Sequence, residues 1–184
     1  HDYLMGERTP MFDLMSWSTD ATRLPYRMHS EYLRRLYLVN ALAEENYRVD
    51  GIVVSLRDIR LPTFAVGTRT DHIAPWQAVY KIHALTDSAI TFVLTSGGHN
   101  AGVVNEPGHP ARVYQIADKA ADAPYVDPDT WRAEVPEREG SWWPAWEDWL
   151  KEHSSGEHDP PSMGAPEKGY APLADAPGQY VLQH

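Results

Sequence analysis

Two residues of complementary chemistry each follow a short apolar run in this sequence. Asp71 comes after the run Thr63–Val66, and His99 comes after Ala89–Leu94 in a glycine-rich loop. A carboxylate that orients an imidazole, which then takes a proton from a hydroxyl or thiol, is a common arrangement in nucleophilic catalysis. The two residues therefore predict acid–base chemistry if the fold brings them together. The alternative is that both are polar loop residues that only cap turns.

The segment between the two residues predicts how the chain positions them. Both apolar runs are short, bounded by polar turns, and rich in β-branched and aromatic residues, as buried strands are. Pro75–Leu85 predicts a helix, because Pro75 suits a first helical turn and apolar residues recur on one face after it. A strand–helix–strand unit predicts parallel strands with a right-handed crossover. Because sites form at the carboxyl ends of such strands, Asp71 and His99 should lie near each other on one rim.

The attacking group of a catalytic triad is missing from the sequence. In α/β-hydrolases the order along the chain is nucleophile, acid and then histidine, and Asp71 and His99 match the last two members. A nucleophile should then precede Asp71. The first 70 residues contain serines only at Ser16, Ser18, Ser30 and Ser55, none of them in a Gly-x-Ser-x-Gly elbow, and the chain has no cysteine. The chain thus carries candidates for the acid and the base without their nucleophile.

A metal site is the second chemistry that these residues suggest. Asp71, His72 and His99 offer nitrogen and oxygen donors of the kind that zinc accepts. No His-Glu-x-x-His pattern or similar spacing supports a metal site, so we predict no metal and place His72 in a supporting or turn position.

Composition limits the class of protein. At 184 residues, 42% of them hydrophobic and 23% charged, the chain is long enough for one domain with a sizeable core. The net charge of -10 argues against a nucleic-acid partner, because nucleic-acid-binding proteins concentrate Lys and Arg. The apolar runs are far shorter than the roughly 20 residues that span a bilayer, which predicts no membrane span. The absence of cysteine excludes disulfides within the chain.

Other stretches predict further elements around this unit. A helix is predicted over Ser30–Glu45 with Ser30 as its cap, and a hairpin over Tyr47–Leu56 with Asp50-Gly51 as its turn. The remaining expectations are a compact irregular segment at 1–25 with a short helix near Phe12–Trp17, a short helix near Asp127–Ala133, a helix beginning at Ser141 with Trp142, Trp146, Trp149 and Leu150 on its apolar face, and a surface tail over Ser154–Ala176.

Several motifs together resemble one family, the polyhydroxyalkanoate synthases, also called poly-β-hydroxybutyrate polymerases. They occur in the family's order and cover nearly the whole chain. The matching pieces are W-S-T-D-A-T-R-L-P (17–25), Y-L-R (32–34), D-I-R-L-P-T (58–63), D-H-I-A-P-W (71–76), F-V-L-T-S-G-G-H-N-A-G-V-V-N-E-P (92–107), G-S-W-W-P-A-W-E-D-W-L (140–150) and A-P-G-Q-Y-V (176–181). A generic α/β-hydrolase would share only an aspartate and a histidine.

The resemblance implies a fold, a division of the chain and a set of site residues. It implies the C-terminal part of an α/β-hydrolase fold, with the last parallel strands, their crossover helix and part of a lid. The implied divisions are 1–45 for the later part of the lid, 46–153 for the hydrolase core and 154–184 for a Pro- and Gly-rich tail. By matching motif, Asp71 is the triad acid, His99 is the general base, and His72 and Trp76 line or brace the site.

The resemblance also implies an activity and its partners. The family polymerises (R)-3-hydroxyacyl-CoA with release of CoA, and a cysteine carries the growing polyester chain. It implies no cofactor, since the CoA thioester is the substrate, and a homodimer in the cytoplasm at the surface of polyester granules. The chain starts with His1 rather than Met, so we expect an excised segment, with the cysteine upstream and no activity in this segment alone.

The sequence departs from the family pattern at a few positions, and other functions stay open. Ser18, Asn100 and Glu106 replace the usual residues, and the motif at Gly164-Ala165 lacks its usual Asn. These departures bear on lid detail and substrate preference. The alternatives are a fragment of an esterase or depolymerase of the same fold, and a non-catalytic remnant associated with granules.

Overall fold

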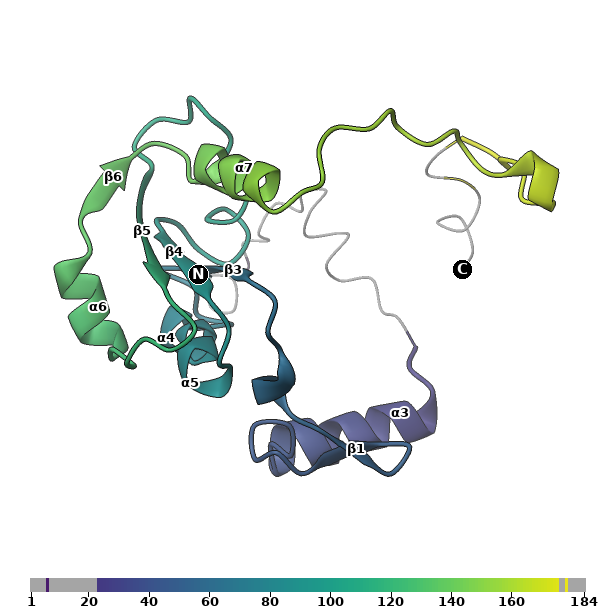
Figure 1. Ribbon diagram of the computed structural model, residues 1–184, viewed down its shortest axis with the longest axis horizontal. Coiled ribbons are helices and arrows are strands. Elements are labelled where there is room, and N and C mark those ends of the chain that lie inside the picture. The colour runs from purple at the N-terminus through teal and green to yellow at the C-terminus, as the bar shows by residue number, and fades with distance from the viewer. Residues whose placement is uncertain (1–5, 7–22, 176–177, 179–184) are drawn as a thin grey trace. The chain divides into compact units, whose positions relative to one another are not determined.

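The computed structural model describes residue 6, residues 23–175 and residue 178, and it divides into two compact units, His1–Trp142 and Trp143–His184. Each unit is described by itself (Figure 1). The short helix expected near Phe12–Trp17 lies outside the described residues. In the part of the chain that the structure describes, no helix is both long and apolar enough to cross a membrane.

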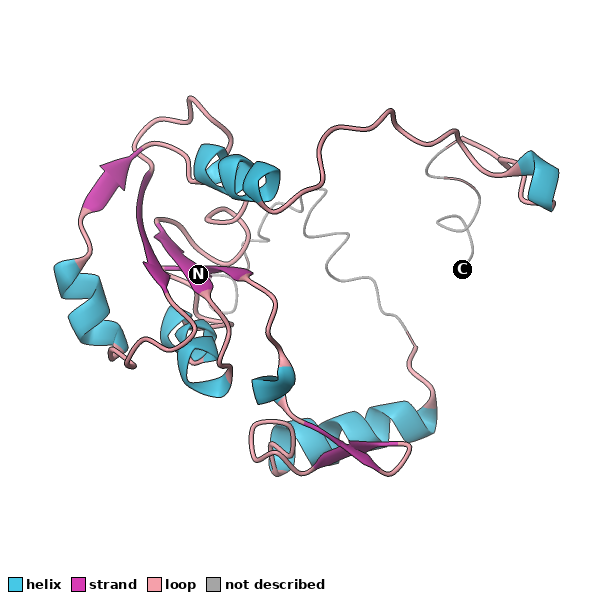
Figure 2. Ribbon diagram, viewed as in Figure 1, coloured by secondary structure: helices cyan, strands magenta, loops and turns pink. Residues whose placement is uncertain are grey.

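A four-stranded mixed sheet is the centre of the first unit (Figure 2). Its order is β3 (Thr63–Thr68), β4 (Ile90–Thr95), β5 (Val113–Lys119) and β6 (Glu137–Glu139). β3 and β4 are parallel, with Thr63 opposite Ile90 and Thr68 opposite Thr95, which confirms the predicted pairing. β5 and β6 are antiparallel to their neighbours. The predicted α/β class is confirmed, with a mixed sheet.

The crossover between β3 and β4 is helical, as predicted, but it is not one continuous helix. It consists of α4 (Trp76–Tyr80) and α5 (Ile82–Leu85), which are separated at Lys81. Pro75 is the N-cap residue of α4, a position at which the helix does not need the backbone N–H that proline lacks. The prediction of a single helix over Pro75–Leu85 is therefore wrong in its continuity and confirmed in its position.

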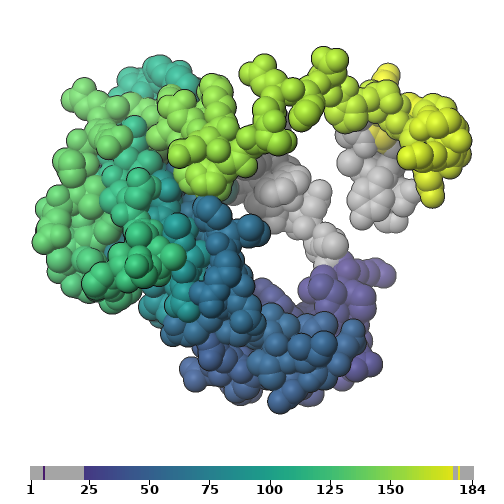
Figure 3. Space-filling model, viewed as in Figure 1, coloured from purple at the N-terminus to yellow at the C-terminus, as the bar shows by residue number. Residues whose placement is uncertain are grey.

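Aromatic packing forms the core between the sheet and the helices that cover it. Ile90, Phe92 and Leu94 of β4 pack against Trp76 and Tyr80 of the crossover and against Trp131 of α6 (Pro128–Glu134). Figure 3 shows the outer surface of the part of the chain that encloses this core, in teal and green. The predicted helix near Asp127–Ala133 is confirmed, and the Asp127 side chain caps it by accepting bonds from two backbone amides.

The helix before the hairpin differs from the prediction in its bounds and its cap. Instead of one helix over Ser30–Glu45, the chain forms α3 (Tyr26–Glu31), followed by the π-helix η1 (Tyr32–Leu38). Pro25, not Ser30, stands at the N-cap of α3. The Val39 amide bonds to the Arg34 carbonyl, five residues back, so the helix widens and ends before the predicted Glu45.

The hairpin between this helix and the sheet is confirmed. β1 (Tyr47–Val49) pairs antiparallel with β2 (Ile52–Val54). Asp50 and Gly51 both have positive φ, 50° and 82°, as a two-residue turn between twisted strands requires.

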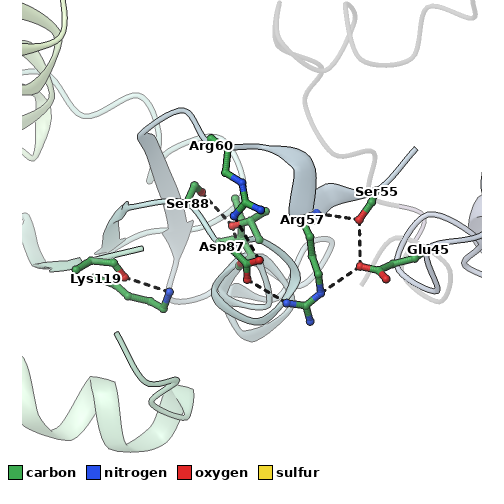
Figure 4. A network of polar contacts seen from close by, with 10 residues as sticks. Glu45, Ser55, Arg57, Arg60, Asp87, Ser88 and Lys119 are labelled. Carbon is green, nitrogen blue, oxygen red and sulfur yellow. Dashed lines mark hydrogen bonds and ion pairs between the residues drawn. The ribbon is translucent and has the colours of Figure 1, made fainter. Parts of the chain in front are cut away.

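A polar network connects the hairpin segment to the sheet (Figure 4). Arg57, in the 3₁₀ turn η2 (Leu56–Asp58), lies between Glu45 and Asp87 at N–O distances of 3.1 and 3.0 Å. Arg60 reaches the second oxygen of Asp87 at 3.4 Å. These exposed ion pairs lie at the amino ends of β3 and β4, opposite the rim that follows Thr68 and Thr95.

In the second unit, α7 (Trp143–Glu152) is followed by the 3₁₀ turn η3 (Pro166–Lys168). The helix predicted after Gly140 is thus present. Trp142 was expected on its apolar face, and that expectation is wrong. Trp142 precedes α7 and is buried in the first unit, where its ring stacks on Phe64 of β3.

Candidate active site

Asp71 is held in a tight turn directly after β3. Its backbone N–H donates to the Thr68 carbonyl at 3.3 Å. Its Oδ1 accepts bonds from the backbone amides of Ile73 and Ala74, both at 2.9 Å, just before α4 begins. Only 7% of the side chain is exposed. The carboxylate is therefore fixed by its own turn, with Oδ2 left to face the neighbouring loop.

The loop after β4 brings His99 to the same rim. Gly97 has a φ of +103°, which L side chains rarely adopt. At Gly102 a Cβ atom would lie 2.5 Å from Cγ2 of Thr68, so only glycine lets the loop fold back against the end of β3. The Thr70 amide also donates to the Gly97 carbonyl at 3.1 Å, which ties the Asp71 turn to the His99 loop.

Asp71 and His99 form a hydrogen-bonded pair. The distance from His99 Nδ1 to Asp71 Oδ2 is 2.9 Å, which confirms the expected proximity on one rim. The ionised carboxylate only accepts hydrogen bonds, so Nδ1 carries a proton and Nε2 of the neutral ring is left as the acceptor. The His99 side chain is 42% exposed, so this nitrogen remains accessible to a reacting group. The geometry suits a general base whose tautomer is fixed by a carboxylate.

The surroundings keep Asp71 ionised. The hydrogen bond from the Ala74 amide, with those from His99 and the Ile73 amide and the nearby charge of His99, lowers the pKa of Asp71 to about 2, although partial burial acts in the opposite direction. A carboxylate with so low a pKa does not take the proton from His99 near neutral pH, so it stays the acceptor of the Nδ1–H bond that orients the ring.

The low pKa of Asp71 predicts a pH dependence of folding stability. A carboxylate whose pKa is depressed in the folded state stabilises the fold above its unfolded pKa, and this contribution is lost as the pH falls through the folded value. The free energy of unfolding should therefore fall between about pH 4 and pH 2. Urea unfolding of the chain and of Asp71→Asn across this range measures the contribution, because the variant lacks the titrating group. Equal pH slopes in the two proteins would contradict the expectation.

The roles expected of His72 and Trp76 stay predictions. His72 is exposed and Trp76 is buried in the core against Tyr80, so neither belongs to the hydrogen-bonded pair of Asp71 and His99. Trp76 supports the rim from below, since its Cβ lies 3.1 Å from the place a Cβ at Gly67 would take. Among residues 23–175, no group of three or more His, Asp or Glu side chains is placed to hold a metal ion.

Several buried or half-buried residues that sequence reasoning did not assign to the site hold the His99 loop or contact Asp71. Trp142 Nε1 donates to the Gly102 carbonyl at 3.2 Å, and Asn105 Nδ2 donates to Thr95 Oγ1 at 3.2 Å. The Ser141 hydroxyl donates to the Asn105 carbonyl. Thr68 Oγ1 points to Asp71 Oδ2 at 3.4 Å. The available signal was that three of these residues lie inside the motifs around 92–107 and 140–150.

The fold and the site define an α/β protein with a carboxylate–imidazole pair at the carboxyl ends of two parallel strands. Comparison with known proteins shows which proteins the chain is similar to. The chain is 36% identical over 181 residues to the poly(3-hydroxyalkanoate) polymerase subunit PhaC of Rhizobium meliloti, 35% over 182 residues to poly(3-hydroxyalkanoate) polymerase 2 of Ectopseudomonas oleovorans, and 38% over 181 residues to the subunit PhaC of Cupriavidus necator.

These matches cover 98–99% of this chain but only 28%, 32% and 30% of the three relatives, respectively. The chain therefore belongs to the poly(3-hydroxyalkanoate) polymerases and corresponds to about 30% of their length. No family model matches the chain. The resemblance inferred from the motifs is confirmed by these relatives.

Proposed function

We propose that this chain supplies the acid–base half of a poly(3-hydroxyalkanoate) polymerase with an α/β-hydrolase fold. The observation that carries the proposal is the 2.9 Å hydrogen bond between His99 and Asp71, in a chain 38% identical to such a polymerase. The substrate is (R)-3-hydroxyacyl-CoA, and the products are a polyester and CoA. No further cofactor takes part, because the thioester is itself the activated acyl donor.

The proposed mechanism assigns the proton transfers to His99 and the stabilisation of its charged ring to Asp71. His99 Nε2 takes the proton of a cysteine thiol, and Asp71 stabilises the resulting imidazolium through Nδ1–H. The thiolate attacks the thioester carbonyl, the C–S bond to CoA breaks, and the CoA thiolate receives the proton held by the His99 imidazolium, which restores the neutral ring. His99 then deprotonates the hydroxyl of the next monomer, whose oxygen attacks the enzyme-bound acyl group. The C–S bond to the cysteine breaks and the cysteine thiolate leaves. This thiolate then attacks the CoA thioester of the added monomer, which releases CoA and returns the extended chain to the cysteine.

The cysteine has to come from outside these 184 residues, because the sequence contains none. We therefore propose that this chain alone is inactive, and that the active protein is a longer polypeptide containing it. We also propose that this longer protein is a homodimer, works in the cytoplasm at the surface of polyester granules, and uses residues 1–45 as the later part of its lid. The proposal that His72 and Trp76 line or brace the site belongs to the same longer protein.

A chimera tests the proposed function. The 181 aligned residues of the Cupriavidus necator polymerase are replaced by this chain, and CoA release from (R)-3-hydroxybutyryl-CoA is measured with a thiol reagent. We expect CoA release and polyester from the chimera and neither from the 184-residue chain alone. Release by the chain alone would contradict the need for an outside thiol. A folded chimera without activity would contradict the proposed function, and one that cleaves esters without making polyester would support the esterase alternative.

A further inference from the structure

One arginine joins the Asp71 turn to the far edge of the sheet. Arg69 follows the last residue of β3, and its backbone N–H donates to the Thr95 carbonyl at 2.9 Å, which extends the pairing of β3 with β4. Its side chain leaves β3 and passes β4. Nη2 lies 3.2 Å from Oε1 of Gln115 on β5 and 2.7 Å from Oε1 of Glu137 on β6. A single guanidinium, which follows the first strand of the sheet, thus contacts the third and fourth strands.

The partners of Arg69 leave it little freedom. Gln115 is 3% exposed, and its Nε2 donates to the carbonyls of Arg132 and Val135, at 2.8 and 2.5 Å, at the end of α6. Because both N–H groups face acceptors, the amide orientation is set and Oε1 must face the guanidinium. The side chain of Arg69 is only 18% exposed. Together, Arg69, Gln115 and Glu137 form a bridge from the end of β3 to α6 and β6.

The bridge is maintained although it leaves one donor unused. Arg69 Nε is buried and has no hydrogen-bond partner among the described residues. An unpaired buried donor costs free energy. The two contacts of Nη2 therefore have to outweigh this cost, and they set the position of the guanidinium. Asp71 lies two residues further along the chain, in a turn whose first carbonyl is that of Thr68. Any movement of Arg69 would therefore be passed directly to this turn.

We infer that Arg69 is a positioning residue: through Gln115 and Glu137 it fixes the turn that presents Asp71 to His99. The importance of this role for catalysis rests on the proposed function, but the geometric inference does not. The groups that lower the pKa of Asp71 are the Ala74 and Ile73 amides and His99, not the charge of Arg69. Arg69 thus acts on Asp71 through the backbone and does not touch a reacting atom.

Two substitutions that change the local charge in opposite directions distinguish a positioning role of Arg69 from an effect of its charge alone. Arg69→Met removes a positive charge and Glu137→Gln removes a negative one. If Arg69 acted only through its charge, the first would raise the pKa of Asp71 and the second would lower it. If the bridge positions the turn, both substitutions weaken the hydrogen bonds to Asp71 and both raise its pKa.

The experiment is an NMR titration of the 184-residue chain, following the Asp71 carboxyl carbon and the His99 Nδ1 proton. We expect Arg69→Met to raise the pKa of Asp71 by about one unit, Glu137→Gln to raise it by less, and both to move the His99 Nδ1 proton upfield. Arg57→Met removes an arginine with two ion-pair partners at the opposite end of the strands, and should leave both signals unchanged.

Each outcome of this titration decides the inference. A folded Arg69→Met protein with unchanged titration overturns it, as does a fall or no change in the pKa of Asp71 in Glu137→Gln. If Arg69→Met does not fold, Glu137→Gln decides alone, because its exposed side chain can be replaced without opening the core. These results do not depend on catalysis, so an inactive chimera would overturn the proposed function and leave this inference standing.

Discussion

Replacing His99 by alanine in the chimera should lower the rate of CoA release by roughly 10²–10⁴-fold, the usual contribution of a general base. In the proposed mechanism, Nε2 of His99 is the proton acceptor, and Asp71 fixes the tautomer of the ring through a 2.9 Å bond to Nδ1. Without the imidazole, the thiol stays protonated at neutral pH and the attack on the thioester slows. The rate is measured as CoA thiol released from (R)-3-hydroxybutyryl-CoA at saturating substrate.

The matched control for this experiment is His158→Ala. His158 is an exposed histidine in the second unit, and the proposed mechanism assigns it no role. Its replacement should change the rate less than twofold. The rate of CoA release by Asp71→Asn should lie between the rates of these two variants, because the imidazole is then present but no longer held in the useful tautomer. A His99→Ala protein with near-normal activity, or with the same small effect as His158→Ala, would remove His99 from the mechanism.

The part of the site that the sequence predicted is the part encoded locally. Thr63–Val66 and Ala89–Leu94 are short apolar runs separated by a helical stretch, so their parallel pairing followed from the length of the connection. The parallel pairing then placed Asp71 and His99 on the same rim without any knowledge of the rest of the fold. The Asp50-Gly51 turn was predictable for the same reason, because two adjacent residues determine its backbone.

The parts that the sequence did not reveal depend on contacts between distant residues. β5 carries Gln115, Asp118 and Lys119 among its apolar residues, so it lacks the continuous apolar run of a buried strand, and β6 is only three exposed residues long. Trp142 has helical spacing with Trp146 and Trp149, but its ring packs on Phe64, 78 positions earlier in the sequence. Periodicity cannot show such a partner, since it records only neighbours along one element.

The division of the chain into lid, core and tail remains a prediction. The structure separates the described residues at Trp142 and Trp143, which reflects the density of contacts within each unit.

The wide π-type turns of η1 were not predicted from the sequence. The spacing of Leu33, Leu36 and Tyr37 suits an ordinary helix, and only the Arg34 carbonyl bond from Val39 distinguishes the wider form.

Phe92→Ala should destabilise the chain by about 3–5 kcal/mol, the usual cost of removing a large aromatic side chain from a core. Phe92 is fully buried in the middle of β4. Its ring makes edge-to-face contacts with Tyr80, Trp131 and His83, at centroid distances of 5.0, 5.2 and 5.4 Å. These three partners belong to three different helices, α4, α5 and α6, so the cavity cannot close by the movement of one element. The loss is measured as a change in the free energy of unfolding by urea.

A second aromatic residue gives the matched comparison. Tyr26 in α3 is 84% exposed, so Tyr26→Ala removes an equally large ring without leaving a cavity and should change the stability by less than about 0.5 kcal/mol. If Phe92→Ala does not fold at all, Phe92→Leu retains most of the volume, and a loss of roughly 1 kcal/mol is then expected. Because β4 leads directly into the His99 loop, a destabilised Phe92 variant should also weaken the pairing of His99 with Asp71. Equal stabilities of the Phe92→Ala and Tyr26→Ala proteins would show that this aromatic cluster is not the core on which the rim depends.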